Sequence, residues 1–287
     1  AKLFYNILTL EKDLANLKAS LQLTKDREEE LKKRSAIGRS RPGEVQMARS
    51  QYAVIESQIK STEGQIITAR GQWQYLTGLE RTTELQTTDL NLIQPKTADF
   101  YIAKLESRPD IKSLQATADA AGANIRVMRA GHIPSVDLTG NYYLLRTGSL
   151  QGVNWDVTLG VTVPLIAGGV VYSQVREAKE AENEADLTLQ QLRRQAQNEV
   201  RSAYDTLVNA LEQIKLLDQA VVATEKNYQE QQHDYRYSLV TNLDVLQAMN
   251  TFLDTKRTLD RTKIQALQAW SLLHAAIGEI PSSGGST

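Results

Sequence analysis

Apolar side chains recur every three to four residues along most of the chain, which is the spacing of one face of an α-helix. Glycines and prolines interrupt this pattern and mark several of the expected helix ends. Gly78 and Gly278 stand where C-terminal caps are expected, and Pro42 suits the first turn of a helix, where its missing N–H is not needed. The predicted helices cover residues 3–37, 44–76, 98–105, 109–130, 170–237 and 244–277.

The pattern changes to strict alternation between residues 136 and 163. In the first limb, the even positions from Val136 to Leu144 carry Val, Leu, Gly and Tyr, and in the second limb the odd positions from Trp155 to Val163 are all apolar. Because successive side chains on a strand point to opposite faces, the sequence predicts two strands, over residues 136–145 and 155–163, each with one apolar and one polar face. Each limb has about ten residues, the length that a tilted strand needs to cross a bilayer.

This hairpin has two interpretations. Amphipathic hairpins on a soluble core are far commoner than membrane hairpins, and alternation alone favours that interpretation. The flanks, however, are long polar helical segments without other strands, and a lone hairpin is only marginally stable in water. We therefore expect the hairpin to complete a sheet with other copies or other parts of the protein. Trp155, Tyr142 and Tyr143 are residues of the kind found at membrane interfaces.

Composition narrows the function classes. The chain has 287 residues and a formal net charge of −1, which does not suggest a nucleic-acid partner. The absence of cysteine is consistent with an oxidising compartment without disulfides. The sequence contains no apolar run of the roughly 18 residues that a transmembrane helix needs, so none is predicted. From Ala185 to Val221, small and apolar residues follow the period of a straight helix, and the many alanines allow neighbouring helices to approach closely.

The second and last long helices align without gaps, which indicates an internal repeat. Glu44 at the start of one helix matches Asp244, and Gly78 at its end matches Gly278. The shared acid, the shared glycine and a similar preceding loop favour duplication. A hairpin and a long helix precede the loop in the second copy, whereas only residues 1–37 precede it in the first. We therefore expect an N-terminally truncated chain, with residue 1 in the middle of an original helix.

Several motifs together suggest a family. They are R-P-D-I-K-S-L-Q-A-T-A-D-A-A (108–121), R-A-G-H-I-P-S-V-D-L-T-G-N-Y (129–142), V-T-V-P-L-I-A-G-G (161–169) and Y-S-L-V-T-N-L-D-V-L-Q-A (237–248). In their order and spacing, the chain resembles the TolC-like outer-membrane factor family of efflux and secretion channels over nearly its whole length.

The resemblance implies a mainly α fold, with long antiparallel helices in a periplasmic α-barrel or helical bundle and one membrane-type β-hairpin. In this family, three protomers each give four strands to a twelve-stranded outer-membrane barrel above the α-barrel. The implied location is the outer membrane of a Gram-negative bacterium, with most of the chain in the periplasm. The implied partners are two further copies of the chain, outer-membrane lipid, a periplasmic adaptor and an inner-membrane pump.

The resemblance also implies roles for the two helix tips, which the family uses to close the channel and to meet the adaptor. The family often has D-V-L-D at the second tip, with acids that narrow the pore; Asp244 matches the first acid, Gln247 stands at the second, and Ser238 replaces the glycine of the tip turn. The predicted pore or tip residues are Asp244, Glu44, Tyr235 and Gln247, the predicted docking residues are Arg34, Arg39, Arg41, Ser238, Leu239, Val240 and Thr241, and the predicted membrane-interface residues are Trp155, Tyr142 and Tyr143.

Asp244 has a second interpretation that is compatible with a pore role. An acid in the first turn of a helix is favoured by the helix dipole, and Thr241 three residues earlier gives the pattern of a capping box.

The predicted organisation has six segments: a truncated first-repeat helical hairpin (1–79), an equatorial connector (80–107), a helix leading to the membrane (108–134), the β-hairpin (135–167), the second-repeat long helical hairpin (168–280) and a disordered tail (281–287).

The sequence shows no catalytic constellation. His132, His233 and His274 are far apart and lack metal-ligand spacing, and Gly168-Gly169 lacks the further glycines and lysine of a nucleotide loop. We therefore predict no enzyme activity, no cofactor and no metal. The main hypothesis is a passive exit duct for the substrates of a pump. The alternative is a structural or adaptor protein of the envelope that uses a helical hairpin as a spacer, but the lipoyl-like and small β-barrel domains of an adaptor are not visible.

Overall fold

The computed structural model describes residues 1–87, 89–90, 93–165 and 168–279. The chain divides into two compact units. The first unit combines residues 1–102 with the chain from residue 198 onward, and the second consists of residues 103–197. Helix α5 (Val170–Arg236) contributes its first part to the second unit and its remainder to the first.

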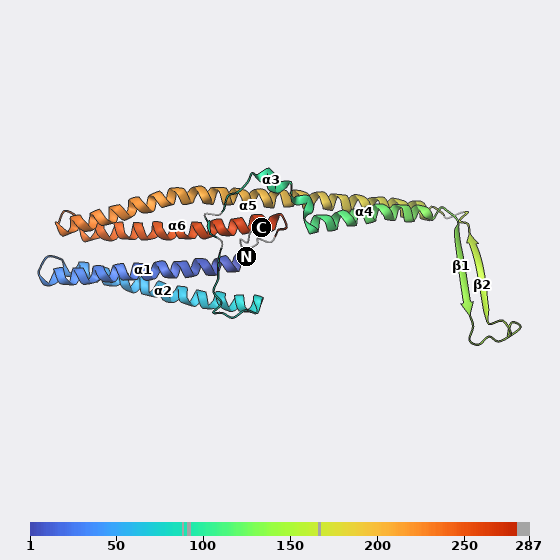
Figure 1. The fold of residues 1–287 in the computed structure, drawn as a ribbon, viewed down its shortest axis with the longest axis horizontal. Helices are drawn as coiled ribbons and strands as arrows, with labels where there is room; N and C mark the ends of the chain where they lie inside the picture. The colour runs from blue at the N-terminus through green and yellow to red at the C-terminus, as the bar shows by residue number, and fades with distance from the viewer. Residues whose placement is uncertain (88, 91–92, 166–167, 280–287) are drawn as a thin grey trace. The chain divides into compact units, whose positions relative to one another are not determined.

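The long helices of the first unit form two antiparallel hairpins (Figure 1). α1 (Lys2–Ala36) and α2 (Pro42–Thr77) form one hairpin, and the end of α5 forms the other with α6 (Asn242–Ala276). α1 also packs against α6, so the two hairpins share a core. The short helix α3 (Ala98–Ile102) belongs to the same unit and buries Tyr101.

The helix ends follow from local chemistry. α2 begins at Pro42 and is followed by Gly78, whose φ of 73° lies in the left-handed region that glycine adopts without strain. Gly278 after α6 has a φ of 77° for the same reason. At the start of α6, the backbone N–H of Asp244 donates to the Thr241 hydroxyl, and the backbone N–H of Thr241 donates to the Asp244 carboxylate. The predicted capping box is thus confirmed, and it satisfies N–H groups that the helix leaves unpaired.

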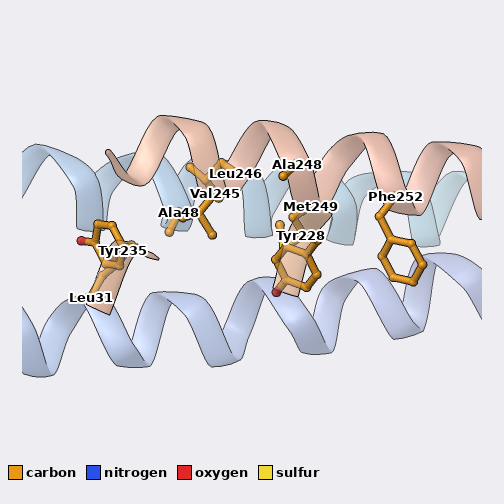
Figure 2. Close-up of a cluster of buried hydrophobic side chains, with 9 residues drawn as sticks. All are labelled: Leu31, Ala48, Tyr228, Tyr235, Val245, Leu246, Ala248, Met249 and Phe252. Carbon is orange, nitrogen blue, oxygen red and sulfur yellow. The ribbon is translucent and has the colours of Figure 1, made fainter. Parts of the chain in front are cut away.

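A cluster of buried side chains from all four long helices lies close to the helix tips (Figure 2). Within it, the rings of Tyr228 and Phe252 stack nearly parallel, with their centroids 6.2 Å apart. Burying one such large apolar side chain contributes about 1.5–3 kcal/mol, so this shared core joins the two hairpins. The cluster consists of Leu31, Ala48, Tyr228, Tyr235, Val245, Leu246, Ala248, Met249 and Phe252.

A buried carboxylate joins α1 to α6 further along the hairpins. Asp13 is only 4% exposed and accepts hydrogen bonds from Arg257 Nε at 3.0 Å and from Arg261 Nη2 at 2.6 Å. Close by, the Asn16 amide donates to Asp260 at 2.9 Å. Polar residues on the inner face of α1 therefore bind specific partners on α6.

In the second unit, α4 packs closely against the first part of α5. A Cβ atom added to Gly131 would lie 3.2 Å from Val171, so a larger residue there would force the neighbouring side chain to move. Arg193 of α5 donates to Glu106 at 3.0 Å. The elements of this unit are η2 (Leu105–Ser107), α4 (Pro109–Ala130), β1 (Ser135–Tyr142), β2 (Trp155–Thr162) and the first part of α5.

The two strands pair antiparallel in a register that aligns their apolar faces. Val136 lies opposite Val161, Leu138 opposite Leu159 and Tyr142 opposite Trp155, while Thr139 lies opposite Thr158 on the other face. Since side chains alternate along each strand, the two sequence patterns merge into one apolar and one polar face. The apolar face is exposed, with Leu138 at 71% and Leu159 at 67%.

The predicted long helices and the hairpin are confirmed, and two extents are corrected. The short helix expected over 98–105 is wrong in extent, because α3 ends at Ile102 and a tighter 3₁₀ turn, η2, leads into Pro109, which disfavours helical backbone just before it. β1 ends at Tyr142 rather than residue 145, although the Tyr143 N–H still donates to the Asn154 carbonyl at 2.7 Å. The tail predicted for 281–287 lies outside the described residues, and the division into six segments stays a prediction.

Candidate functional site

The candidate site lies at the tips of the two helical hairpins of the first unit, which are the loops 37–41 and 237–241. The backbones of these two loops have the same conformation. The Arg39 N–H donates to the Arg34 carbonyl at 2.9 Å, and the Leu239 N–H donates to the Asp234 carbonyl at 3.0 Å. Gly38 has a φ of 74°, and the residue at the matching position of the second tip, Ser238, has a φ of 60°. Both loops thus turn through one left-handed residue, and Ser238 makes this turn without the freedom of glycine.

Tyr235 is the centre of the contacts between the tips. Its ring is buried between two guanidinium groups, with Arg27 at 4.1 Å and Arg34 at 4.5 Å from the ring centroid. Its hydroxyl donates to Glu44 at 3.2 Å, and its carbonyl accepts from Arg34 Nη2 at 3.3 Å. Burial raises the pKa of the Tyr235 hydroxyl, so it stays protonated and keeps this donor. One side chain of α5 therefore binds both helices of the first hairpin.

Arg27 adds a second link between the hairpins. Its Nε and Nη2 atoms donate to the side-chain carbonyl of Asn242 at 3.0 and 2.8 Å, and its Nη1 donates to Glu30 at 2.7 Å. Arg27 and Asn242 are 3% and 1% exposed. A buried charge is tolerated only when it is paired and hydrogen bonded, which Glu30 and Asn242 provide.

The two acids at matching positions have different partners. Glu44 accepts hydrogen bonds from the hydroxyls of Ser40 at 2.5 Å and Tyr235 at 3.2 Å, and it is half-buried. Asp244 is exposed, and the hydroxyl and backbone N–H of Thr241 both bind its carboxylate, at 2.6 and 2.8 Å. These two bonds lower the pKa of the Asp244 carboxyl, which is therefore ionised at neutral pH.

A cavity of about 770 Å³ lies between the two loops. Of the predicted tip residues, Arg34, Arg39, Arg41, Glu44, Tyr235, Ser238, Val240 and Thr241 line it. Leu239, Gln247 and Asp244 line a neighbouring cavity of about 570 Å³ at the second loop. The structure thus brings the predicted docking residues and the predicted pore residues together at one end of the first unit.

The predicted membrane-interface residues lie at the loop end of the hairpin. Tyr142 and Trp155 form the last cross-strand pair and share the apolar face. Tyr143 faces the opposite way, as alternation requires, and the Arg146 guanidinium lies 4.4 Å from its ring centroid. Tyr142 and Trp155 therefore mark one end of the exposed apolar face, and Tyr143 lies next to them on the polar side.

Within the described residues, no group of three or more His, Cys, Asp or Glu side chains is arranged to hold a metal ion. No helix of the described chain is both long and apolar enough to cross a membrane.

Sequence reasoning missed Arg27, Asn242 and Ser40 as members of the tip cluster. Arg27 lies in a run of charges that predicts a solvated surface. A signal was present, however, because helical spacing continues the buried stripe from Leu17 through Thr24 and Arg27 to Leu31. A charge on the helix face that also carries Leu17 and Leu31 indicates a buried partner.

Comparison with known proteins gives the family. Residues 102–279 match the family model described as outer membrane efflux protein. The chain belongs to this family. The match confirms the predicted family.

Relatives and solved structures agree with this family. The outer membrane protein TolC of Escherichia coli is 24% identical over 98% of this chain and 60% of its own length, and the proteases secretion protein PrtF of Dickeya chrysanthemi is 24% identical over 85% and 56%. The crystal structure of the outer membrane protein VceC from Vibrio cholerae has a TM-score of 0.80 at 22% identity, covering 97% of this chain and 68% of VceC. For CusC the TM-score is 0.84 at 20% identity, covering 97% of this chain and 67% of CusC.

These likenesses confirm the predicted mainly α fold with its membrane-type hairpin. The chain spans about 60% of the length of the TolC relative.

Proposed function

We propose that the chain is part of an outer-membrane exit duct of a Gram-negative bacterium, which serves an efflux pump or a secretion system. The observation that carries this proposal is the register of the β-hairpin. Pairing aligns Val136, Leu138 and Tyr142 with apolar residues of β2, and the resulting face is exposed to its surroundings. An exposed apolar face of this kind marks a surface that contacts lipid or other protein.

The length of the apolar face suits a bilayer. Leu144 and Val163 continue the exposed apolar pattern one step beyond the strands. About ten residues at about 3.3 Å each, tilted by about 40°, span about 25 Å, which is the height of the apolar band of an outer-membrane barrel. Strand edges are heavily penalised in lipid, so we propose that hairpins of several protomers close into one barrel, as in a trimer.

The helix tips would form the closed end of the duct. The contacts of Tyr235 and Arg27 hold the two hairpins of one protomer together, which supports a role in keeping the tip narrow. Asp244 is exposed and ionised, so three copies around an axis would attract cations and resist anions. In this proposal the tip also meets a periplasmic adaptor, which connects the duct to an inner-membrane pump.

A matched pair of substitutions tests the hairpin. Leu159→Arg places a charge on the apolar face, and Thr158→Arg places the same charge on the polar face of the neighbouring position. A lipid-facing arginine costs about 2–4 kcal/mol at the middle of the bilayer. We expect Leu159→Arg to abolish assembly into the outer membrane and Thr158→Arg to leave assembly intact, as measured by membrane fractionation of the protein expressed in its host. Equal assembly of both variants would contradict a lipid-facing apolar surface.

Ion selectivity tests the duct itself. In planar-bilayer recordings of the protein purified from the outer membrane, Asp244→Asn should weaken cation preference, whereas Asp244→Glu, which keeps the charge, should retain it. Unchanged selectivity in Asp244→Asn would reduce the residue to its capping role at α6.

A further inference from the structure

The cavity between the two tip loops carries more positive than negative charge. Arg34, Arg39 and Arg41 line it together with a single acid, Glu44. The Glu44 carboxylate is already bound by the hydroxyls of Ser40 and Tyr235. Among the described residues, neither Arg39 nor Arg41 has a carboxylate within ion-pair distance, and both are exposed. The cavity therefore presents cations that the first unit does not neutralise.

Two buried donors at the same cavity also lack acceptors. The Arg34 Nε and Asn242 Nδ2 atoms are buried and have no hydrogen-bond partner in the described part of the chain. Asn242 is 1% exposed, and its other polar atom is bound by Arg27. Both unpartnered atoms can only donate. Most buried polar groups in proteins find a partner, so these two atoms indicate that an acceptor belongs at this cavity.

The cavity wall also has an apolar part. Met47 of α2, together with Val240 and Leu243 of the second tip, also lines the cavity. A free inorganic anion would leave this apolar wall in contact with water. A protein segment that carries an acid beside an apolar residue would match both parts.

We propose that this cavity receives an Asp or Glu side chain from the tip of the partner that docks on the duct, next to an apolar side chain of the same partner. This inference rests on the proposed function, because it assumes that the tip meets a periplasmic adaptor. Guanidinium groups bind carboxylates in a fork geometry and are weakly hydrated, so arginine is well suited to such an interface. The same excess of positive charge would repel a lysine or arginine at the position of the acid.

The test uses the protein in its outer-membrane form and the purified periplasmic adaptor of the same bacterium. The double variant Arg39→Gln/Arg41→Gln removes two cavity charges without altering the residues that hold the hairpins together. Arg49→Gln is the matched control, since Arg49 is exposed on α2 and does not line the cavity. We expect the double variant to raise the Kd about tenfold or more and to reduce the dependence of binding on salt, with no such change in the control.

A double-mutant cycle identifies the acid on the partner. Each acidic residue at the tip of the adaptor hairpin is replaced by its amide, and each replacement is combined with the double arginine variant. If the losses of binding free energy from the arginine variant and from one acid replacement are not additive, those residues contact each other, because the effects of interacting residues are not independent. Arg34→Lys keeps a charge but removes the Nε donor, and it should weaken the same acid-bearing adaptor and not its amide variant.

Three results would overturn the proposal, and they are distinguishable from one another. Binding that ignores both the arginines and the adaptor acids would remove the carboxylate site and leave the duct function standing. Sulfate that competes with the adaptor more strongly than sodium chloride at equal ionic strength would identify a site for a small inorganic anion. A complete lack of adaptor binding by the unaltered protein would overturn the docking partnership and this inference together.

Discussion

Replacing Asp13 by asparagine should destabilise the first unit by about 2–3 kcal/mol. A hydrogen bond to a charged group contributes about 1.5–3 kcal/mol, and removing one partner of a buried ion pair costs about 3–5 kcal/mol. The Asp13 side chain is 5% exposed, whereas those of Arg257 and Arg261 are 30% and 51% exposed. Water can therefore hydrate the two guanidinium groups in the variant, and the asparagine oxygen can still accept one bond, which places the loss at the low end.

Thermal unfolding followed by far-ultraviolet circular dichroism measures this loss. A domain of this size loses about 2–4 °C in Tm for each kcal/mol, so Asp13→Asn should melt roughly 5–10 °C below the unaltered protein. Asp254→Asn is the matched control, because Asp254 is exposed on α6 and no ion pair of the described residues involves it. The control should shift Tm by no more than about 1 °C.

The pH dependence provides a second, independent check. Burial opposes ionisation of Asp13, but the hydrogen bonds from Arg261 and Arg257 outweigh it, so the pKa of its carboxyl lies below the ordinary value of 3.8. A depressed pKa gives stabilisation that is fully present above pH 3.8 and is lost as the pH falls through the folded-state value. The Tm difference should shrink in strong acid. A difference below about 1 °C at neutral pH, or one that acid leaves unchanged, would refute the assigned role of the ion cluster.

Five substitutions at the tips should have opposite or graded effects on stability. Ser238→Gly should stabilise the folded protein by about 0.5–1 kcal/mol, because removing the strain of a left-handed serine outweighs the extra conformational entropy that glycine gives the unfolded chain. Gly38→Ala at the matching turn should destabilise the folded protein, and measurement of Tm distinguishes the two effects. Thr241→Ala should lower stability by about 1 kcal/mol through loss of the α6 cap, while Thr241→Ser should keep it. Tyr235→Phe removes the bond to Glu44 and should cost about 0.5–1.5 kcal/mol, seen as faster amide hydrogen exchange in residues 37–41 and 237–241.

The helices were predictable because their signals are local and repeated. The apolar period located α1, α2, α4, α5 and α6, and Gly78 and Thr241 marked helix ends whose chemistry acts within one turn. The matching backbones of the two tips also agree with the internal repeat found in the sequence. Extents were less certain where the chain must meet a second constraint, as where Pro109 shortens the turn before α4.

The partners of buried charges were not predictable from local pattern. Asp13 binds arginines that lie on the last helix of the chain, and Arg27 binds Asn242 at the start of that helix. The sequence near Asp13 and Arg27 does not indicate these partners, because it is the packing of α1 against α6 that brings them together. Register was hidden for a similar reason, since alternation gives each strand its faces but the joining segment 143–154 decides which residues pair.

The two tips share a backbone but not their side chains, and this difference has a structural consequence. Arg34 of the first tip matches Asp234 of the second, and Tyr235 of the second matches Ser35 of the first. The contact between hairpins within one protomer therefore uses arginines from one repeat and a tyrosine from the other. In a ring where such hairpins alternate, the contact between neighbouring protomers would bring the opposite sides of the same repeats together and could not repeat this chemistry.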